Sequence, residues 1–171
     1  MSTQTKEQPQ ADESMGTKPQ KEHEWLSKLV GEWNAEADMC MPDGSKSTSK
    51  GTESVKSLSG LFSYHHAKLA MPGGPSIEVY VALGYDVTFN EYRKVDVMSV
   101  SSHIWNYKGQ LSSDGKRLTL DCEGPNMNGE GTAQYRDVIE VQDDNHRTLT
   151  SYWQLENGQF EEMMKVRYVR A

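Results

Sequence analysis

Covalent catalysis needs a nucleophilic side chain beside a base, and the chain contains a serine–lysine spacing that could supply them. Ser47-Thr48-Ser49-Lys50 has the Ser-x-x-Lys spacing of some acylating enzymes, in which a helix start brings the lysine to the serine. Here the stretch has the pattern of a hairpin and strand, which keeps the two groups apart. The sequence has no Gly-x-Ser-x-Gly elbow, no lysine-bearing phosphate loop and no His-Glu-x-x-His motif. We therefore predict no catalytic residue, and an enzyme is the less favoured reading.

Adjacent histidines and acids also fail as metal ligands or acid/base couples. Successive residues of a strand point to opposite faces, so His65 and His66 are expected to be separated. His146 follows acidic residues in a turn, where such groups are usually solvated. We predict no metal site and no cofactor. The same parity separates two acidic pairs, Glu161 with Glu162 and Asp143 with Asp144.

One expected strand carries an imidazole and two aromatic rings on the same face. His103, Trp105 and Tyr107 are spaced two residues apart, so their side chains point the same way. Pockets for flat or polar-headed ligands have this composition. The alternative is a hydrogen-bonded histidine at a strand end. His103 and Trp105 are candidate ligand-binding residues.

A second expected strand places a carboxyl group among apolar residues. Either Tyr135 and Asp137 face the interior or Arg136 does, and Ile139 favours the first choice because it has the same parity. A buried Asp137 would need a polar partner. Tyr135, Asp137 and, as a further aromatic wall, Trp153 complete the candidate ligand-binding residues.

The residues in front of these strands predict a short helix that ends at the first strand. Apolar residues at 25, 26, 29 and 30 lie along one helical face, and Gly31 is expected to end the helix because glycine adopts positive φ at no steric cost. From Trp33 the apolar residues alternate with a period of two. The sequence therefore predicts a helical plug followed directly by a strand.

About ten strands follow, separated by turn residues every 8 to 14 positions or so, as in an all-β barrel or sandwich. A succession of hairpins needs no long crossover, and closure removes exposed edges. We predict a closed or nearly closed antiparallel up-and-down β-barrel. The remaining expected strands cover residues 47–58, 61–70, 77–85, 92–100, 103–110, 117–122 and 132–141 and two more on either side of Asn157-Gly158, with loops at 71–76 and 124–131.

Composition limits the partners and the domain organisation. A net charge of -7 in 171 residues opposes binding to phosphate backbones and anionic membranes, so neither nucleic acid nor membrane is an expected partner. The chain has no apolar run of membrane-spanning length and no signal peptide pattern, and a cytoplasmic location is expected. Residues 1–19 are almost wholly polar and are predicted to be a disordered tail. Residues 20–171 then form a single domain.

Several ordered motifs resemble domain of unknown function 1579, a bacterial family of uncharacterised proteins. The resemblance implies a calycin-like barrel, similar to lipocalins, with no established activity. It also implies that Trp33 packs across the closed end beneath Arg167 or Arg170, a pairing that the cation–π attraction supports. The motifs are Trp25-Leu26-x-x-Leu29-Val30-Gly31-x-Trp33, Gly51-Thr52-Glu53, Met71-Pro72-Gly73-Gly74, Leu83-Gly84-Tyr85-Asp86, Tyr135-Arg136-Asp137-Val138-Ile139-Glu140 and Asp144-x-His146-Arg147-x-Leu149-Thr150-Ser151-Tyr152.

Three functional readings follow from this barrel. The favoured one is a binding module for a small apolar or amphipathic ligand, entered on the side of the loops at 71–76 and 124–131. The second is an enzyme or haem protein on the same scaffold. Related calycin-like haem proteins take their iron ligand from a histidine near the C-terminus, and this chain has no histidine after His146. The third is a barrel filled by its own side chains that acts through its surface.

Overall fold

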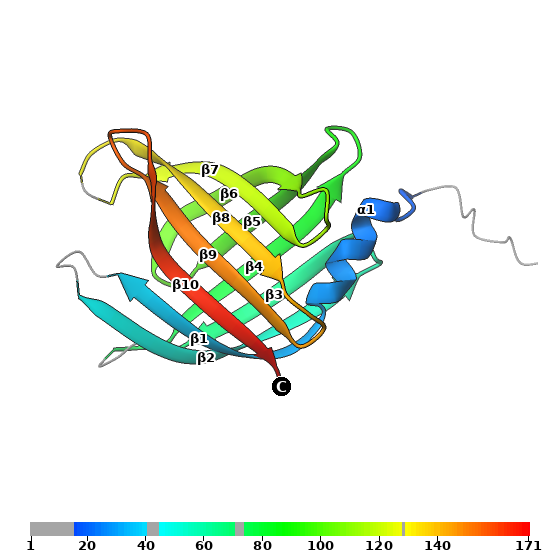
Figure 1. Cartoon of the computed structure of the whole chain (residues 1–171), viewed down its shortest axis with the longest axis horizontal. Helices are drawn as coiled ribbons and strands as arrows, with labels where there is room; N and C mark the ends of the chain where they lie inside the picture. The colour runs from blue at the N-terminus through cyan, green and yellow to red at the C-terminus, as the bar shows by residue number, and fades with distance from the viewer. Residues whose placement is uncertain (1–15, 41–44, 71–73, 128) are drawn as a thin grey trace, which may run out of the picture.

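The computed structural model describes residues 16–40, 45–70, 74–127 and 129–171, which form one closed antiparallel barrel (Figure 1). Every strand pairs with its neighbours in the chain, and β1 pairs with β10 to close the ring. The predicted up-and-down barrel is confirmed. The elements are α1 (Lys21–Glu24), η1 (Trp25–Leu29), β1 (Gly31–Cys40), β2 (Lys46–Leu58), β3 (Phe62–Leu69), β4 (Ile77–Asp86), β5 (Glu91–Met98), β6 (Ser101–Leu111), β7 (Arg117–Pro125), β8 (Thr132–Val141), β9 (His146–Gln154) and β10 (Phe160–Arg170).

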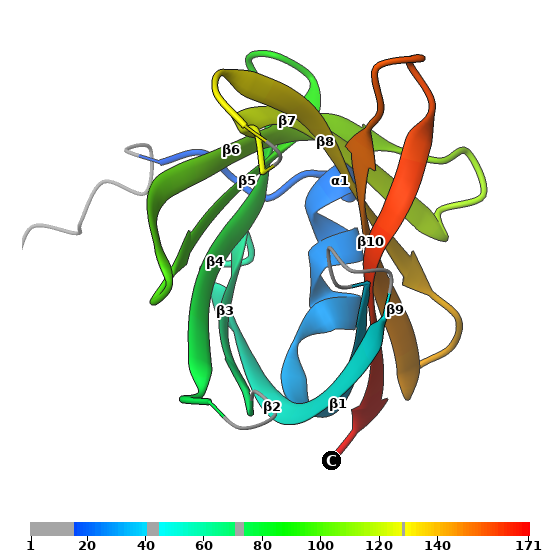
Figure 2. The ribbon, with the colours of Figure 1, turned by 90° about the vertical axis from the view of Figure 1, so that its left-hand side faces the viewer.

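The two ends of the barrel differ. Figure 2 looks into the barrel and shows the blue helical segment of α1 and η1 behind the ring of strands. Trp25, Leu26 and Leu29 are buried, and the Trp25 indole N–H donates to the Gly115 carbonyl between β6 and β7 at 3.0 Å. We call this segment, residues 21–29, the plug. The opposite end, where β1 and β5 finish, is the open end.

Trp33 joins the plug to the barrel wall. Its side chain is 1% exposed, and its indole N–H donates to the Leu29 carbonyl oxygen at 2.9 Å. The Arg170 guanidinium lies 4.3 Å from the ring centroid and donates to the Val30 carbonyl at 2.9 Å. Of the two arginines considered from the sequence, Arg170 therefore covers the indole. Arg167 instead pairs with Asp38 on the outer face.

The helical segment differs from the single helix expected at residues 25–30. Four residues of α-helix are followed by the 3₁₀ turn η1, and Val30 is already extended. Gly31 is the first residue of β1, with φ of 140°. A Cβ there would lie 2.1 Å from Arg170 Nη1, so this position needs glycine both for its backbone and for the arginine beside it.

Most strand boundaries differ from the sequence prediction by one to three residues. Leu61 lies in the turn before β3. Gly124, expected in a loop, lies in β7 and pairs with Ala133 of β8. The Trp105 ring occupies the space that a side chain at this position would need, since an added Cβ would lie 2.3 Å from Trp105 Cζ3. Residues 71–73 and 128 of the two expected entrance loops lie outside the described residues.

The N-terminal tail lies mostly beyond what the structure describes. Residues 1–15 of the predicted tail at 1–19 are outside the described residues, and residues 16–19 are exposed and have no regular structure. Within the described residues, no helix has the length and apolar character needed to cross a membrane.

Removal of the Trp33 side chain is expected to destabilise the barrel. Trp33→Ala deletes a fully buried indole, its hydrogen bond to Leu29 and its contact with Arg170, so the free energy of unfolding should fall by about 3–5 kcal/mol. Chemical denaturation measures this loss. Trp153→Ala is the matched control, because Trp153 is only partly buried and lies outside the plug. A loss below about 1 kcal/mol for Trp33→Ala would contradict the role assigned to the indole.

Candidate functional site

A cavity of about 240 Å³ lies inside the barrel, lined by residues from both walls. Most of its lining is apolar. The side of β3 to β5 contributes residues such as Leu69, Ile77 and Val79, while Trp105 and Tyr135 contribute aromatic surface from β6 and β8. Trp105 and Tyr135 meet edge to face with ring centroids 4.9 Å apart, so one wall of the cavity is rigid and aromatic.

Methionines gather where the cavity approaches the open end. Five of them line it, at the end of β1, the end of β5, the β7–β8 connection and the start of β10. The thioether side chain is flexible and polarisable, and it adapts to guests of different shape. This rim can therefore accommodate an apolar group without a fixed outline. The residues are Met39, Met98, Met127, Met163 and Met164.

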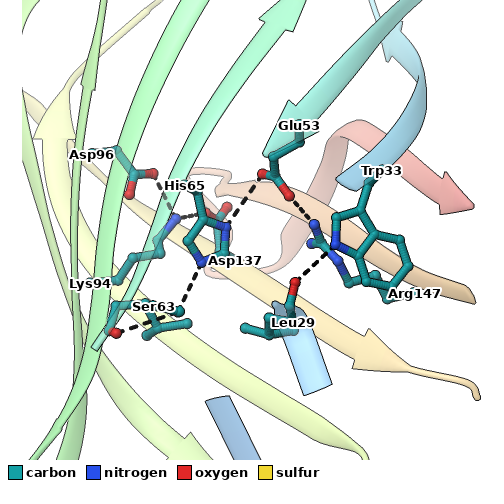
Figure 3. Close-up of polar contacts among 10 residues, drawn as sticks. Leu29, Trp33, Glu53, Ser63, His65, Lys94, Asp96, Asp137 and Arg147 are labelled. Atoms are coloured by element: carbon teal, nitrogen blue, oxygen red, sulfur yellow. Dashed lines mark hydrogen bonds and ion pairs between the residues drawn. The ribbon is translucent and has the colours of Figure 1, made fainter. Parts of the chain in front are cut away.

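A buried lysine occupies the middle of the cavity wall. Lys94 Nζ donates to Asp96 Oδ2 at 2.7 Å and to Asp137 Oδ2 at 2.5 Å (Figure 3). It also lies 3.9 Å from the centroid of the Tyr107 ring. Ser151 Oγ donates to the other Asp137 oxygen at 2.6 Å. The group links β5 to β8 and β9 across the barrel. The lysine is thus held by two carboxylates and is not free to bind an anion.

Burial and charge act in opposite directions on this cluster. Burial alone would lower the pKa of Lys94, but the nearby Asp137 and Asp96 carboxylates outweigh it and raise the pKa above its usual value. Burial raises the pKa of Asp96, while Lys94 opposes that shift. Burial also raises the pKa of Tyr107, next to the same carboxylates. Lys94 is therefore charged at neutral pH.

A second ionic group lies nearer the closed end, against Trp33. Arg147 pairs with Glu53, and its guanidinium lies 4.7 Å from the Trp33 ring centroid and 3.8 Å from that of Tyr168. Burial lowers the pKa of Arg147 to about 10, which leaves the arginine charged at neutral pH. Figure 3 shows Glu53 between Arg147 and His65. The Trp33 indole consequently has one guanidinium from the barrel interior and one from Arg170.

Ser63, His65 and Glu53 contact one another in the sequence serine–histidine–acid, as the members of a hydrolase triad do. Ser63 Oγ is 2.9 Å from His65 Nε2, and His65 Nδ1 is 3.4 Å from Glu53 Oε1. Burial, together with the Lys94 charge, lowers the pKa of His65 to about 4, so it is neutral at pH 7. Ser63 is fully buried and does not line the cavity. A substrate carbonyl in the cavity has no access to its hydroxyl, so this group is best explained as interior hydrogen bonding.

Three polar atoms on residues of the cavity wall lack a protein partner among the described residues, and one of them is Arg147 Nε, whose residue is only 2% exposed. Asp96 Oδ1 and Trp105 Nε1 are both buried without a hydrogen bond, and both residues line the cavity. Asp96 and Trp105 are paired across β5 and β6. Two neighbouring residues of the wall therefore carry an unpaired acceptor and an unpaired donor. An unpaired buried polar group costs free energy that a bound molecule could recover.

Three of the five candidate residues proposed from the sequence line the cavity and two do not. Trp105, Tyr135 and Asp137 line the cavity. His103 lies outside the lining and contacts Trp105 edge to face at 4.9 Å, while Trp153 borders a separate surface depression and donates to Glu161 at 3.2 Å. The polar partners that a buried Asp137 was expected to need are Lys94 and Ser151, which both donate hydrogen bonds to its carboxylate.

Most of the ionic residues in the wall were not identified from the sequence. These are Glu53, His65, Lys94, Asp96 and Arg147. The one local signal was the spacing of Lys94 and Asp96, since opposite charges two residues apart in a strand share a face. The partners in β8 and β9 are more than 40 residues away and have no local signature. No set of three His, Cys, Asp or Glu side chains in the described residues is arranged to hold a metal ion.

Comparisons with known proteins agree with this fold. The model of the family described as "Protein of unknown function (DUF1579)" matches residues 18–170. The S-type phycobiliprotein lyase CPES from Guillardia theta has a similar solved structure, with a TM-score of 0.56 and 11% sequence identity over 86% of this chain and 91% of that chain. At this identity the similarity shows the fold alone. A comparison with curated proteins gives no match.

Loss of the buried lysine charge is expected to be costly. Lys94→Met would leave Asp96 and Asp137 buried without their cation, so we expect the free energy of unfolding at pH 7 to fall by about 3–5 kcal/mol in urea denaturation. The surface pair of Lys50 with Glu36 supplies the control, since Lys50→Met should cost less than about 1 kcal/mol. Equal losses for the two variants would show that the interior charges are solvated.

Acid should destabilise the folded barrel through His65. The folded pKa of His65 is about 4 against 6.5 for the free side chain, so the unfolded chain takes up a proton that the folded chain refuses. The resulting contribution of His65 to the free energy of unfolding is roughly 3 kcal/mol. It is fully present above pH 6.5 and is lost as the pH falls to 4.

His65→Gln should remove that part of the pH dependence, as measured by denaturation between pH 7 and pH 4. His66→Gln is the control, because His66 lies on the outer face with a side chain 35% exposed. A His65→Gln curve parallel to that of the unmodified protein would contradict a neutral, buried His65.

Proposed function

The chain belongs to the DUF1579 family, and we propose that it is a binding protein for a small amphipathic molecule held inside the barrel. The observation that carries this proposal is the cavity of about 240 Å³, with a methionine rim, apolar walls and buried polar atoms. Pockets for small molecules combine mostly apolar walls with a few placed polar groups. The apolar part of the ligand would lie towards the open end and its polar part near Asp96 and Trp105.

The cavity argues against a barrel that fills its own interior. Eight strands make a barrel just wide enough for side chains to fill, and this one has ten. Small side chains at Ala35, Ala37 and Ala67 add room on the inner face. The interior is therefore wide enough to hold a guest, whose volume would be somewhat below that of drug-sized ligands.

The alternative is an enzyme, because the solved structure with a similar fold is that of a lyase. The geometry gives it less support. The acidic and basic groups on the cavity wall are paired with each other, and Ser63, whose hydroxyl contacts the His65 ring, is closed off from the cavity. A haem protein has less support still, because His65 is engaged with Ser63 and Glu53 and His103 does not line the cavity.

A neutral hydrophobic fluorescent dye tests the binding proposal. Phenylnaphthylamine should bind with a stoichiometry of about one, since one cavity of this kind lies inside the described barrel. Ile77→Trp puts a bulky ring at the open end of the cavity and should weaken dye binding by about tenfold or more without unfolding the domain. Fluorescence titration measures both.

Val95→Trp is the matched control, because Val95 lies on the outer face and is 38% exposed. It should leave the dye affinity unchanged. Absence of saturable binding, or equal effects of the two substitutions, would favour a barrel that acts through its surface. Titration with hemin should give no sharp Soret band, and a stoichiometric histidine-type spectrum would favour the haem alternative.

A further inference from the structure

The charges inside the barrel are unequal. Three carboxyl groups line the cavity, those of Glu53, Asp96 and Asp137, against two cations, Lys94 and Arg147. His65 does not restore the balance, because burial keeps it neutral at pH 7. The lining of the cavity therefore has one more carboxyl group than it has cations.

Both cations are already engaged by the protein. Lys94 contacts Asp96 and Asp137, and Arg147 contacts Glu53 and lies over the rings of Trp33 and Tyr168. A ligand carboxylate would have to displace Asp96 or Asp137 to reach Lys94. At Arg147 only the Nε–H is without a partner among the described residues, and this residue is 2% exposed, against 7% for Asp96 and for Trp105. A ligand carboxylate would also enter beside the excess acid, where like charges repel.

The unsatisfied atoms on the wall point to the opposite kind of ligand. Asp96 is 7% exposed and accepts from Lys94 with one oxygen, while its Oδ1 has no partner among the described residues. Trp105 is also 7% exposed, and its indole N–H likewise has no acceptor in the described part of the chain. The register places the two residues directly opposite each other on β5 and β6.

We propose that the cavity selects a neutral or cationic head group that donates to Asp96 Oδ1 and accepts from the Trp105 N–H, and that it discriminates against carboxylates. A primary amide has the matching donor and acceptor, and an alkyl ammonium satisfies the carboxylate alone. The apolar chain of the ligand runs towards the methionine rim. This inference rests on the proposed function, since it specifies what the same cavity binds.

The excess carboxylate gives the recognition its strength. Burial raises the pKa of Asp96, because an ionised carboxylate with one unpaired oxygen is costly in a low-dielectric interior. A donor from the ligand removes that cost. Hydrogen bonds to charged groups contribute more than those between neutral groups, so the Asp96 contact should outweigh the Trp105 contact.

A series with one alkyl chain and three head groups tests the proposal. Decylamine, decanamide and decanoate are compared at pH 7 as competitors of bound phenylnaphthylamine. Decanamide and decylamine should bind about tenfold or more tightly than decanoate, as expected for one hydrogen bond to a charged acceptor. If decanoate binds as tightly as the other two, the proposed selectivity is wrong.

Two substitutions locate the recognition. Asp96→Asn can still accept from Lys94 but turns the free acceptor into a donor, so decylamine should bind about tenfold more weakly and decanoate more tightly than to the unmodified protein. Trp105→Phe keeps an aromatic wall and removes the N–H. This substitution should weaken the binding of decanamide by a few-fold and leave the affinity for decylamine unchanged.

Matched variants outside the cavity lining serve as controls. Asp121→Asn changes an outer-face aspartate whose side chain is 46% exposed, and Trp153→Phe changes a tryptophan outside the cavity lining. Neither should alter the order of the three head groups. An unchanged order in Asp96→Asn would overturn the proposal even if the dye binds. Failure of the dye itself to bind would instead refute the proposed function.

Discussion

Pairing of charges inside the barrel is the constraint on which the interior depends. Lys94 on β5 reaches Asp137 on β8, and Arg147 on β9 reaches Glu53 on β2. A buried charge without a partner costs several kcal/mol, so these contacts penalise any register that separates the partners. A shift of one residue in β5 would turn Lys94 outward and leave Asp137 without its cation. The ionic contacts thus help to specify how strands far apart in the sequence face one another.

The plug and the ionic groups form a continuous layer at the closed end. Trp33 receives a guanidinium contact from Arg170 and another from Arg147, and its N–H holds the end of η1. Arg147 pairs with Glu53, and Glu53 in turn contacts His65. The cavity consequently has a polar floor and an apolar, methionine-lined upper part. An amphipathic molecule matches this gradient better than a wholly apolar one.

The sequence predicted the barrel better than it predicted the contents of the barrel. Period-two alternation and turn residues gave the ten strands, and Trp33 was correctly placed at the closed end. Alternation does not say which face of a strand is inside. In β5 the apolar Val95 and Val97 are 38% and 40% exposed, while Lys94 and Asp96 are buried. Hydropathy favours the wrong face here, because the stabilising partner comes from another strand.

Stability alone does not account for the ionic groups in the cavity wall. Apolar side chains of similar volume often replace a buried ion pair at no cost or with a gain in stability. Leucine-sized residues at Lys94, Asp96 and Asp137 would extend the apolar surface already formed by Val79, Leu83 and their neighbours. Such a barrel would have no reason to distinguish one apolar guest from another. With charged groups fixed by each other, the wall keeps an acceptor and a donor in defined positions before any ligand arrives, so little reorganisation opposes binding.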